Sequence, residues 1–321
     1  MISRVADHCF WFGRYLERAE STARLLAATL SLSLDGEAPA QLSWRPLLVV
    51  AGEEPTFLAR HGGDPARAWS DGERIQRFMT WDEANPVSLR TSIGSARWNA
   101  QAIRDVVSLE AWETVNELHL WLRGGAATTE WTGNRDGFYR HVRRATQLTL
   151  GLLRSTMLHD EPLNFIWLGV LLERVGQTAR TLDVHHHAFT ELADDAGGRH
   201  EVIETTLWLG LLRALSGTEP FMRRVHGRIR AEAVASFLLD ERLFPRSIAY
   251  GVRAAHERLA TLVAEPPAQG PGTAALARLR TLDGALAAPR HGDDAVHATL
   301  THVIAEIDAV GVAIGAELLG G

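Results

Sequence analysis

Two stretches of this 321-residue sequence share one pattern and decide its fold. Residues 11–26 read WFGRYLERAESTARLL, and residues 167–182 read WLGVLLERVGQTARTL. Nine of the sixteen positions are identical, and they include a tryptophan and a glycine, so composition alone does not explain the match. The apolar positions of both stretches recur three and four residues apart, which is the spacing of one face of an α-helix. The pattern predicts two related helices, offset by 156 residues.

Three shorter motifs of the first half recur in the second half, in the same order and at nearly the same offset. They are W-x-x-L-L at residues 44–48 and 208–212, E-P at 54–55 and 219–220, and P-x-S at 86–88 and 245–247. This order indicates an internal duplication with halves 1–160 and 161–321. Because neither half would bury its apolar helix faces alone, we expect them to pack as one compact unit about a pseudo-twofold axis.

Helical periodicity extends along almost the whole chain, and strand-like alternation is hard to find. With 46% hydrophobic and 22% charged residues, the chain has enough apolar material for a core. We therefore predict an all-α helical bundle. Helices are expected at residues 3–34, 44–51, 71–78, 86–109, 111–123, 136–158, 163–187, 201–215, 230–239, 245–264, 273–288 and 295–318. Loops rich in Gly, Pro and Asp are expected at residues 35–40, 61–65, 194–198, 265–272 and 289–294.

Composition excludes several classes of function. All 33 basic residues are arginine, so this chain alone forms no Schiff base and supplies no Walker A lysine. Its single cysteine, Cys9, excludes an internal disulfide and a cysteine zinc cluster. A net charge of −6 does not suit a general nucleic-acid binder. Apolar runs far shorter than about 18 residues predict no membrane span. Charges near the N-terminus argue against a signal peptide, so we expect a cytoplasmic protein.

Each helix of the repeat carries a glycine, a glutamate and an arginine close to one face, beside the apolar positions. These residues are Gly13, Glu17 and Arg24 in the first helix, and Gly169, Glu173 and Arg180 in the second. A pseudo-twofold axis would bring both sets to one cleft, which predicts a centre that binds a charged substrate. There Glu17 and Glu173 would be the catalytic acid/base groups, and the substrate would be bound by Arg14, Arg18, Arg24, Arg174 and Arg180. The alternative is a duplicated set of salt bridges that only closes a helix interface.

A second candidate region is the N-P-x-S motif at residues 85–88. Asn85 suits a helix N-cap and Pro86 the first turn, so Ser88 would lie among the free amides of a helix N-terminus, which attract anions. The same helix carries Asn99 in a polar strip and Arg97 in a stripe of arginines. We predict Asn85, Ser88, Arg97 and Asn99 as further substrate-binding residues. Ordinary capping and a solvated arginine face are the alternatives.

The sequence predicts neither a metal nor a cofactor. His185, His186 and His187 are consecutive, so their side chains point in different directions and cannot share one metal ion without unwinding the helix. Neither H-E-x-x-H nor the E-x-x-H of di-iron bundles occurs. The tryptophans fall mostly at helical positions and are expected to anchor the core. Cys9 lacks a histidine or asparagine context, so we do not expect it to be a nucleophile.

Residues 3–26 contain the motif S-R-V-A-D-x-x-x-W-x-G-R-Y-x-E-R-A-E-x-T-A-R-L-L. With residues 78–88, 96–100, 112–116 and 151–183, this motif resembles the bacterial alpha-E family, whose members are all-helical proteins of about this length. The resemblance covers most of the chain. It departs at Trp98, where an acidic residue is expected, and over residues 43–55.

The resemblance implies which proteins this one works with. Family members are typically encoded beside, or fused to, a circularly permuted ATP-grasp ligase, and transglutaminase-like proteases and a proteasome-like peptidase occur in the same neighbourhoods. This implies a role with such a ligase in synthesis or modification of a small peptide or protein tag, from a small peptide or amino-acid substrate. The matching polar residues here are Arg4, Arg14, Glu17, Arg18, Glu20, Arg24, Asn85, Ser88, Arg97, Asn99, Asn116, Glu173, Arg174, Arg180 and Asp183.

Three functions remain open at this point. The first is a partner subunit of an ATP-grasp ligase that holds a charged substrate at the Glu/Arg cleft. The second is a stand-alone hydrolase or acyl transferase with Glu17 or Glu173 as base, and the third is a non-catalytic scaffold. The chain lacks a nucleotide loop, a lysine and a complete nucleophile triad, which favours the partner and the scaffold. Neither nucleic acid nor a membrane is expected as a partner.

Overall fold

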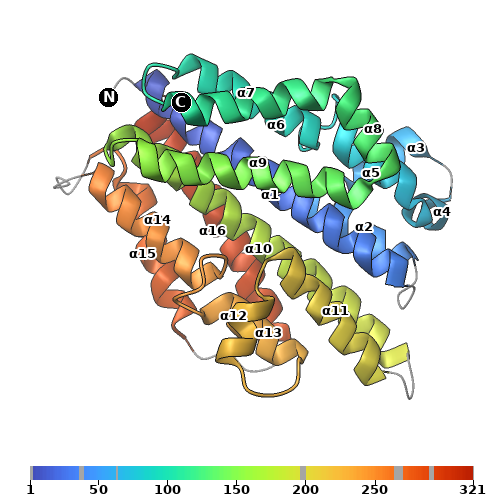
Figure 1. Ribbon diagram of the computed structural model, residues 1–321. Coiled ribbons are helices and arrows are strands. Elements are labelled where there is room, and N and C mark those ends of the chain that lie inside the picture. The colour runs from blue at the N-terminus through green and yellow to red at the C-terminus, as the bar shows by residue number, and fades with distance from the viewer. Residues whose placement is uncertain are drawn as a thin grey trace.

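Helices make up all the regular structure in the described part of the chain, so the prediction of an all-α fold is confirmed. Two long helices, α1 (Ser3–Asp35) and α10 (Glu161–Asp195), run through the middle of the molecule and pack against each other (Figure 1). The computed structural model describes residues 3–35, 40–62, 64–195, 200–263, 270–288 and 293–320.

The remaining helices form two groups around this pair (Figure 1). The first group comprises α2 (Ala40–Ala51), α3 (Glu54–His61), α4 (Pro65–Ser70), α5 (Gly72–Trp81), α6 (Leu89–Ala102), α7 (Leu109–Arg123), α8 (Gly125–Gly133) and α9 (Arg135–Thr156). The second comprises α11 (His200–Ala214), α12 (Thr218–Arg224), α13 (Ala231–Asp240), α14 (Ile248–Leu262), α15 (Thr273–Leu286) and α16 (Asp293–Ile314), which continues as the π-helical segment Gly315–Leu319.

Each helix expected from the sequence is present, but some ends were predicted wrongly: both ends of α6, the start of α14 (expected at 245, found at 248) and the end of α10 (expected at 187, found at 195). The expected range, 86–109, is cut at both ends. Residues 86–88 form a turn, and the Ser88 hydroxyl caps α6 by accepting a hydrogen bond from the Thr91 amide at 3.1 Å. Ser247 caps α14 in the same way, through the amide of Tyr250. Four short helices, α3, α4, α8 and α12, were not predicted, because two helical turns hold too few apolar positions to show a period.

Two glycines let the backbones of α1 and α10 meet. A Cβ atom added to Gly13 would lie 2.0 Å from the carbonyl oxygen of Ile166, and one added to Gly169 would lie 2.1 Å from that of Phe10. No other residue fits such a contact, because real Cβ atoms do not approach carbonyl oxygens so closely. The close approach therefore depends on the two glycines of the repeated motif.

The packing of the two groups follows a common order. Helix α1 packs on α6 and α9, with α7 between them, while α10 packs on α14 and α16, with α15 between them. Each long helix also contacts the other group, α1 through α11 and α10 through α2. The α1–α10 pair is thus the element that joins both groups.

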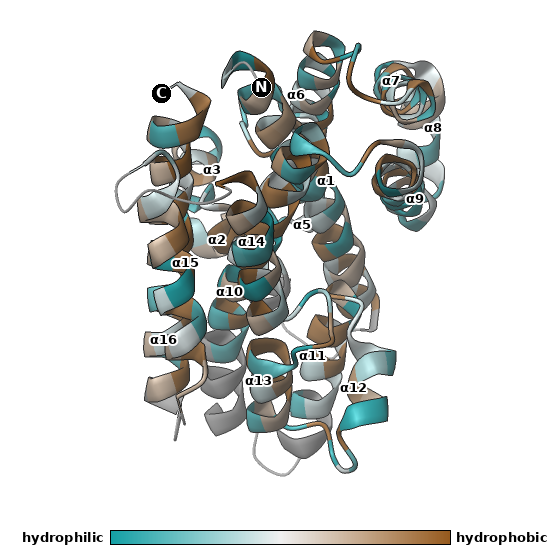
Figure 2. Ribbon diagram, turned by 90° about the vertical axis from the view of Figure 1, so that its left-hand side faces the viewer, coloured by the Kyte–Doolittle hydropathy of each residue, from teal (hydrophilic) through white to brown (hydrophobic). Residues whose placement is uncertain are grey.

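The predicted core positions are buried. Leu16, Ala19 and Ala23 of α1, and Leu172, Val175 and Ala179 of α10, are at most 1% exposed. In Figure 2, brown and teal segments alternate along outer helices such as α15 and α16, as expected of amphipathic helices with one face on the core. No described helix is both long and apolar enough to cross a bilayer.

The tryptophans follow the prediction only in part. Trp44, Trp112 and Trp208 are buried in the core, and Trp11, Trp121 and Trp167 are half-buried. Trp98 is an exception with 63% of its surface exposed, and its ring packs edge-on against His8.

Candidate functional site

The two Glu-Arg pairs of the repeat bind each other across the α1–α10 interface. Arg174 donates to both carboxylate oxygens of Glu17, at 3.0 and 2.6 Å, and Arg18 donates to both oxygens of Glu173, at 2.7 and 3.0 Å. Both glutamates are buried. They lie one turn after Gly13 and Gly169, so the close backbone contact brings them within reach of the opposite helix. Two-pronged, charge-assisted hydrogen bonds replace the water that each carboxylate loses.

A third buried glutamate extends this network on α1. Glu20 accepts hydrogen bonds from Arg24 at 2.8 Å, and its carboxylate lies 2.9 Å from the guanidinium of Arg246. Arg246 also donates to Glu17 at 3.1 Å and so bridges the two carboxylates. Arg24 makes a further hydrogen bond to the Ser216 hydroxyl. Arg246 belongs to the turn before α14, so the second group of helices holds this end of the network.

Glu173 likewise accepts hydrogen bonds from several donors at the α1–α10 interface. Besides Arg18, it accepts hydrogen bonds from Arg14 at 2.8 Å and from Gln177 at 3.3 Å. Both oxygens of this buried carboxylate are therefore engaged with donors from both long helices.

These ion pairs keep the buried carboxylates charged. Burial alone would raise the pKa of Glu173, but the guanidiniums of Arg18 and Arg14 hold it well below its usual range. Burial likewise opposes ionisation of Glu20, but Arg246 and Arg24 lower its pKa to about 2. A general base works best when its pKa lies near the working pH. Carboxylates with such a low pKa are better suited to holding arginine side chains in place than to accepting protons.

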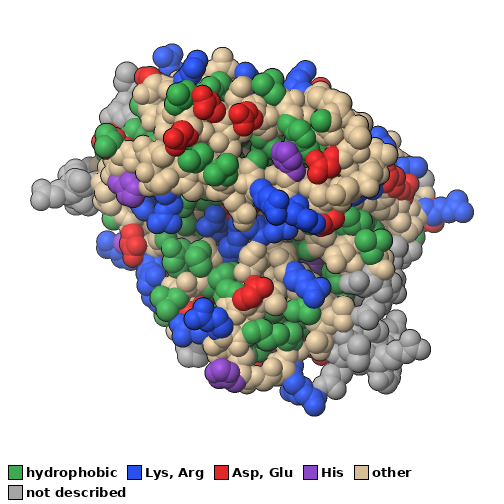
Figure 3. All heavy atoms as spheres, viewed as in Figure 1, with side chains coloured by type: hydrophobic (Ala, Val, Ile, Leu, Met, Phe, Trp, Pro, Cys, Tyr) green, Lys and Arg blue, Asp and Glu red, His purple; other side chains and the backbone are tan. Residues whose placement is uncertain are grey.

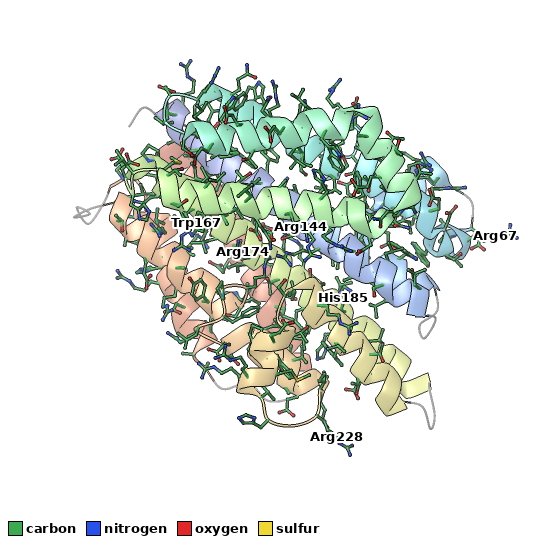
Figure 4. The ribbon with its side chains drawn as sticks, in the orientation of Figure 1. Arg67, Arg144, Trp167, Arg174, His185 and Arg228 are labelled. Carbon is green, nitrogen blue, oxygen red and sulfur yellow. The ribbon has the colours of Figure 1, made fainter. Side chains whose placement is uncertain are left out.

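A cavity of about 320 Å³ opens beside the network and carries an excess of positive charge. Its charged lining comprises Arg14, Arg18, Arg24, Arg180, Arg246, Glu173 and Asp308. Figure 4 shows Arg174 of α10 in the central region of the molecule, where Arg144 of α9 is also labelled, and Figure 3 shows basic side chains gathered in a hollow across the middle of the same face; neither of these two arginines lines the cavity. Because five guanidiniums face two carboxylates, the cavity attracts anions.

Arg180 differs from the other cavity arginines in its partners. In the described structure it makes no hydrogen bond or ion pair, and Glu173 and Asp308 act on it only from beyond contact distance. Burial lowers the pKa of Arg180, and the attraction of these two carboxylates does not offset that effect. Its guanidinium lies over Gly176 and faces the cavity.

The structure brings together seven of the eleven residues predicted for the site. Five of them line the cavity: Arg14, Arg18, Arg24, Glu173 and Arg180. The other two, Glu17 and Arg174, bind each other in the adjoining ion-pair network. The other four predicted residues are Asn85, Ser88, Arg97 and Asn99, and none of them lines the cavity.

Asn85 and Ser88 serve local structure. The Asn85 amide donates to the carbonyl of Phe78 and accepts from the amide of Val87, so it fixes the turn before α6. Ser88, and not Asn85, is the N-cap. The prediction erred because N-P-x-S offers two capping residues, and the chain uses the later one.

Arg97 is half-buried on α6, where it contacts α7, and Asn99 is buried between α6 and the start of α1. Arg97 donates to Asn116 at 2.8 Å and lies over the ring of Trp112. Asn99 donates to the Ser95 carbonyl and pairs with His8 at 2.9 Å. These contacts account for both side chains without a ligand.

Sequence reasoning missed two charged residues of the cavity, Arg246 and Asp308. Arg246 is the middle residue of the second P-x-S motif, and the matching residue of the first, Val87, also lines the cavity. The repeat therefore contained the signal for Arg246. Asp308 is an exposed residue of α16 outside every motif, and no sequence signal distinguishes it.

Among the described residues, the surroundings of His185 and Cys9 do not favour a reactive role. Burial lowers the pKa of His185 to about 4, so the ring is neutral near pH 7, and the side chain of His187 lies outside the described residues. Burial, with help from Asp160 and Asp105, raises the pKa of the Cys9 thiol to about 12, which leaves it a poor nucleophile. Among described residues, no three potential ligand side chains come close enough to hold a metal ion.

A profile for a predicted alpha-helical domain with a conserved ER motif, named Alpha-E, matches residues 1–319. The chain belongs to the Alpha-E family. Proteins similar to it include the uncharacterized proteins Rv2567 of Mycobacterium tuberculosis and Mb2597 of Mycobacterium bovis, each 26% identical over 263 residues. The alignment covers 77% of this chain but 28% of each relative, so the chain spans little more than a quarter of their length. No solved structure matches it.

This Alpha-E chain contains five Glu-Arg dipeptides, and the structure separates them. The pairs at 17–18 and 173–174 have buried glutamates that bind each other's arginines. The glutamates of the pairs at residues 73–74, 241–242 and 257–258 are 53%, 18% and 68% exposed. The two Glu-Arg pairs of the repeat are thus the ones that hold the interface of the long helices together.

Proposed function

We propose that this Alpha-E protein binds an anionic substrate in the arginine-lined cavity and acts with a circularly permuted ATP-grasp ligase in the synthesis or modification of a small peptide or protein tag. The observation that carries the binding step is the charge of the cavity, five guanidiniums against two carboxylates. Planar guanidiniums bind carboxylates and phosphates in two-pronged fashion. A carboxylate is also the group that an amide-forming ligase must activate, so the two parts of the proposal agree chemically.

In this proposal the glutamates position the arginines and the substrate contacts are made by Arg14, Arg18, Arg24 and Arg180. The low pKa of Glu173 supports a positioning role over that of a general base. A stand-alone hydrolase would need a base that accepts a proton near neutral pH, and no observation favours that alternative.

We further infer that residues 1–160 and 161–321 are homologous halves about a pseudo-twofold axis. Support comes from the reciprocal contacts of Gly13 with Ile166 and of Gly169 with Phe10, which join positions that the repeat aligns. The reciprocal Glu-Arg pairs and the common packing order of the two helix groups support it as well. On this view the cavity lies beside the axis, where both halves contribute arginines.

The partnership rests on the family resemblance and on the length of the relatives. In the mycobacterial relatives, the region similar to this chain makes up 28% of a longer polypeptide. A helical unit that forms part of a longer polypeptide is covalently joined to further protein, and this supports a partner that works beside the region described here.

A reconstitution experiment tests the proposal. The protein is co-purified with a circularly permuted ATP-grasp ligase from the same organism, and ATP consumption is measured with amino acids and dipeptides as substrates. We expect a stable complex whose ATP turnover falls at least tenfold in Arg180→Gln, while the complex still forms. Arg140→Gln, on the exposed side of α9, serves as the matched control and should behave as wild type. Absence of a complex, or equal turnover in Arg180→Gln, would reject the proposal.

A further inference from the structure

Between residues 17–24 and the aligned residues 173–180, the two repeated helices differ in charge at one position. Residues 17–24 of α1 read ERAESTAR, and the aligned residues 173–180 of α10 read ERVGQTAR. Glu20 in the first helix thus corresponds to Gly176 in the second, while Arg24 and Arg180 are aligned arginines. Helix α10 therefore has the aligned arginine, Arg180, but no glutamate at the position that corresponds to Glu20.

In α1 the glutamate one turn before the arginine neutralises it. Arg24 donates through Nε to Glu20 at 2.8 Å, and its Nη2 lies 2.7 Å from the same carboxylate. Both side chains are buried, so this pair displays how a carboxylate sits against the aligned arginine inside the protein. Such a pair is favourable when the carboxylate is held in place by further donors, as Arg246 does here.

In α10 the corresponding place holds no carboxylate, and the guanidinium of Arg180 lies over it. A Cβ atom added to Gly176 would meet only the end of the Arg180 side chain, 3.1 Å from Nη2 and 3.3 Å from Nη1. Glu173, the nearest buried carboxylate on this helix, already accepts from Arg14, Arg18 and Gln177. Arg180 therefore lines the cavity without a carboxylate in contact anywhere in the described structure.

We propose that Arg180 and Gly176 form a carboxylate subsite, in which a carboxylate of the ligand takes the place beside Arg180 that Glu20 takes beside Arg24. This deepens the proposed function, on which it rests for the identity of the ligand as the substrate. Glycine lacks, relative to glutamate, a CH2–CH2–COO⁻ group. The ligand that supplies this group is a carboxylate on a short unbranched aliphatic stem, as in an acidic side chain, and it approaches the guanidinium of Arg180 from the cavity.

The charge around the subsite favours an anion with that shape. Arg14 and Arg18 line the same cavity, and both donate to a single carboxylate, that of Glu173. A ligand carboxylate would supply the missing counter-charge to Arg180. Asp308 lies at the cavity wall on α16 and would repel a second ligand carboxylate on its side, so the subsite admits one acidic group.

The test uses the full chain and three small probes: propionate, its neutral analogue propionamide, and inorganic phosphate. Binding is measured by nuclear magnetic resonance titration, because a ligand this small binds weakly. Wild type should bind propionate more tightly than either other probe. Arg180→Gln should weaken propionate binding at least tenfold.

A tethered carboxylate gives the sharper variant. Gly176→Glu adds the missing group to the chain itself and should weaken propionate binding at least tenfold, with a melting temperature no lower than wild type. Gly151→Glu is the matched control, because Gly151 lies on the exposed face of α9 with nothing within 4 Å of an added Cβ. It adds the same charge and should leave propionate binding unchanged.

The outcomes separate this inference from the proposed function. No propionate binding by wild type, tighter binding of phosphate, or undiminished binding in either subsite variant overturns the subsite. If Gly176→Glu does not fold, Arg180→Gln alone decides. Intact propionate binding together with no ligase complex would reject the partnership and support the subsite. A working ligase complex in which neither variant weakens propionate binding would support the partnership and reject the subsite.

Discussion

At the scale of single residues, the centre of this protein is built from buried carboxylates shared between arginines. Glu17 accepts from Arg174 and Arg246, and Glu173 accepts from Arg14 and Arg18. Arginine suits this role because its planar fork offers two parallel donors to one carboxylate. Each glutamate therefore neutralises more than one cation, and its loss would leave two guanidiniums in a poorly solvated place.

Glu173→Gln tests how much the shared carboxylate contributes to stability. Removing the charge leaves Arg14 and Arg18 without a counter-ion, and breaking a buried ion pair typically costs about 3–5 kcal/mol. We expect a loss of that order in the free energy of unfolding, measured by urea denaturation. Glu257→Gln is the control, since Glu257 is 68% exposed and should change stability by less than about 0.5 kcal/mol. Equal stability of the two variants would mean that the pair contributes nothing net.

The acid dependence of stability reports on Glu20. Its pKa is about 2 in the folded protein, below the ordinary value of 4.5, so the folded state binds the proton less readily than the unfolded state. The resulting stability is fully present above pH 4.5 and is lost as the pH falls through 2. The shift corresponds to at most about 3 kcal/mol.

The measurement compares wild type with Glu20→Gln by urea denaturation from pH 7 to pH 2. Wild type should lose stability between pH 4.5 and 2, and the variant should lose less over the same interval. A variant curve parallel to that of wild type would show that Glu20 does not contribute to the acid sensitivity.

At the scale of elements, the sequence predicted long helices well and short ones poorly. The repeat located α1 and α10, because a period of three and four residues is unmistakable over thirty residues. Helix α8, nine residues of mostly small and polar side chains, buries only Ala127 and Trp131 and has no such period. The ends of α6 were predicted wrongly because Asn85 and Ser88 both suit a cap, and only the backbone decides between them.

The site was predictable to the extent that it lies within the repeat. Glu17 and Glu173 were expected to approach each other's helices because their motif is duplicated, and their arginine partners lie in the same motif. Arg246 reaches the site from the second P-x-S motif, in the turn before α14, whereas Asp308 reaches it from α16 through tertiary packing that local pattern does not encode. The repeated motif thus indicated the Glu-Arg pairs of the two long helices, while the rest of the cavity lining depends on the fold.

The contact between the long helices gives the third prediction. Gly13→Ala should destabilise the protein, because the added Cβ would lie 2.0 Å from the Ile166 carbonyl and force α1 and α10 apart. Overpacking of this kind costs about 1–3 kcal/mol. Gly169→Ala should have the same effect against Phe10.

Gly151→Ala provides the control for helix propensity. It lies in α9 with open space around an added Cβ, so alanine should stabilise it by up to about 1 kcal/mol. Opposite signs for Gly151→Ala and Gly13→Ala, in thermal or urea denaturation, would assign the cost to the interface. A gain in all three variants would contradict the close contact.

At the scale of the whole molecule, the α1–α10 pair determines how the two groups of helices depend on each other. The buried face of α1 that contains Leu16 belongs to the same hydrophobic core as Leu172 of α10 and Leu279 of α15. Helices α1 and α10 and the turn before α14 each supply part of the ion-pair network, so neither the part of the chain before α10 nor the part that begins with α10 can complete its buried charges alone. The bundle should therefore fold as one cooperative unit.

Calorimetry tests this coupling. We expect one unfolding transition whose van't Hoff and calorimetric enthalpies agree, as for a two-state unit. Leu16→Ala should lower the midpoint of that transition as a whole. Deleting a buried leucine side chain costs about 2–5 kcal/mol, and the space that it leaves lies in a core common to both groups.

Fragments cut between α9 and α10, residues 1–158 and 159–321, should each lack a cooperative transition, because each would expose one long apolar helix and several unpaired buried charges. Mixing the two fragments should restore the transition if the interface alone joins them. Two separate transitions in the intact chain, with Leu16→Ala shifting only one, would instead mean that the groups are independent domains and that the ion-pair network is a surface between them.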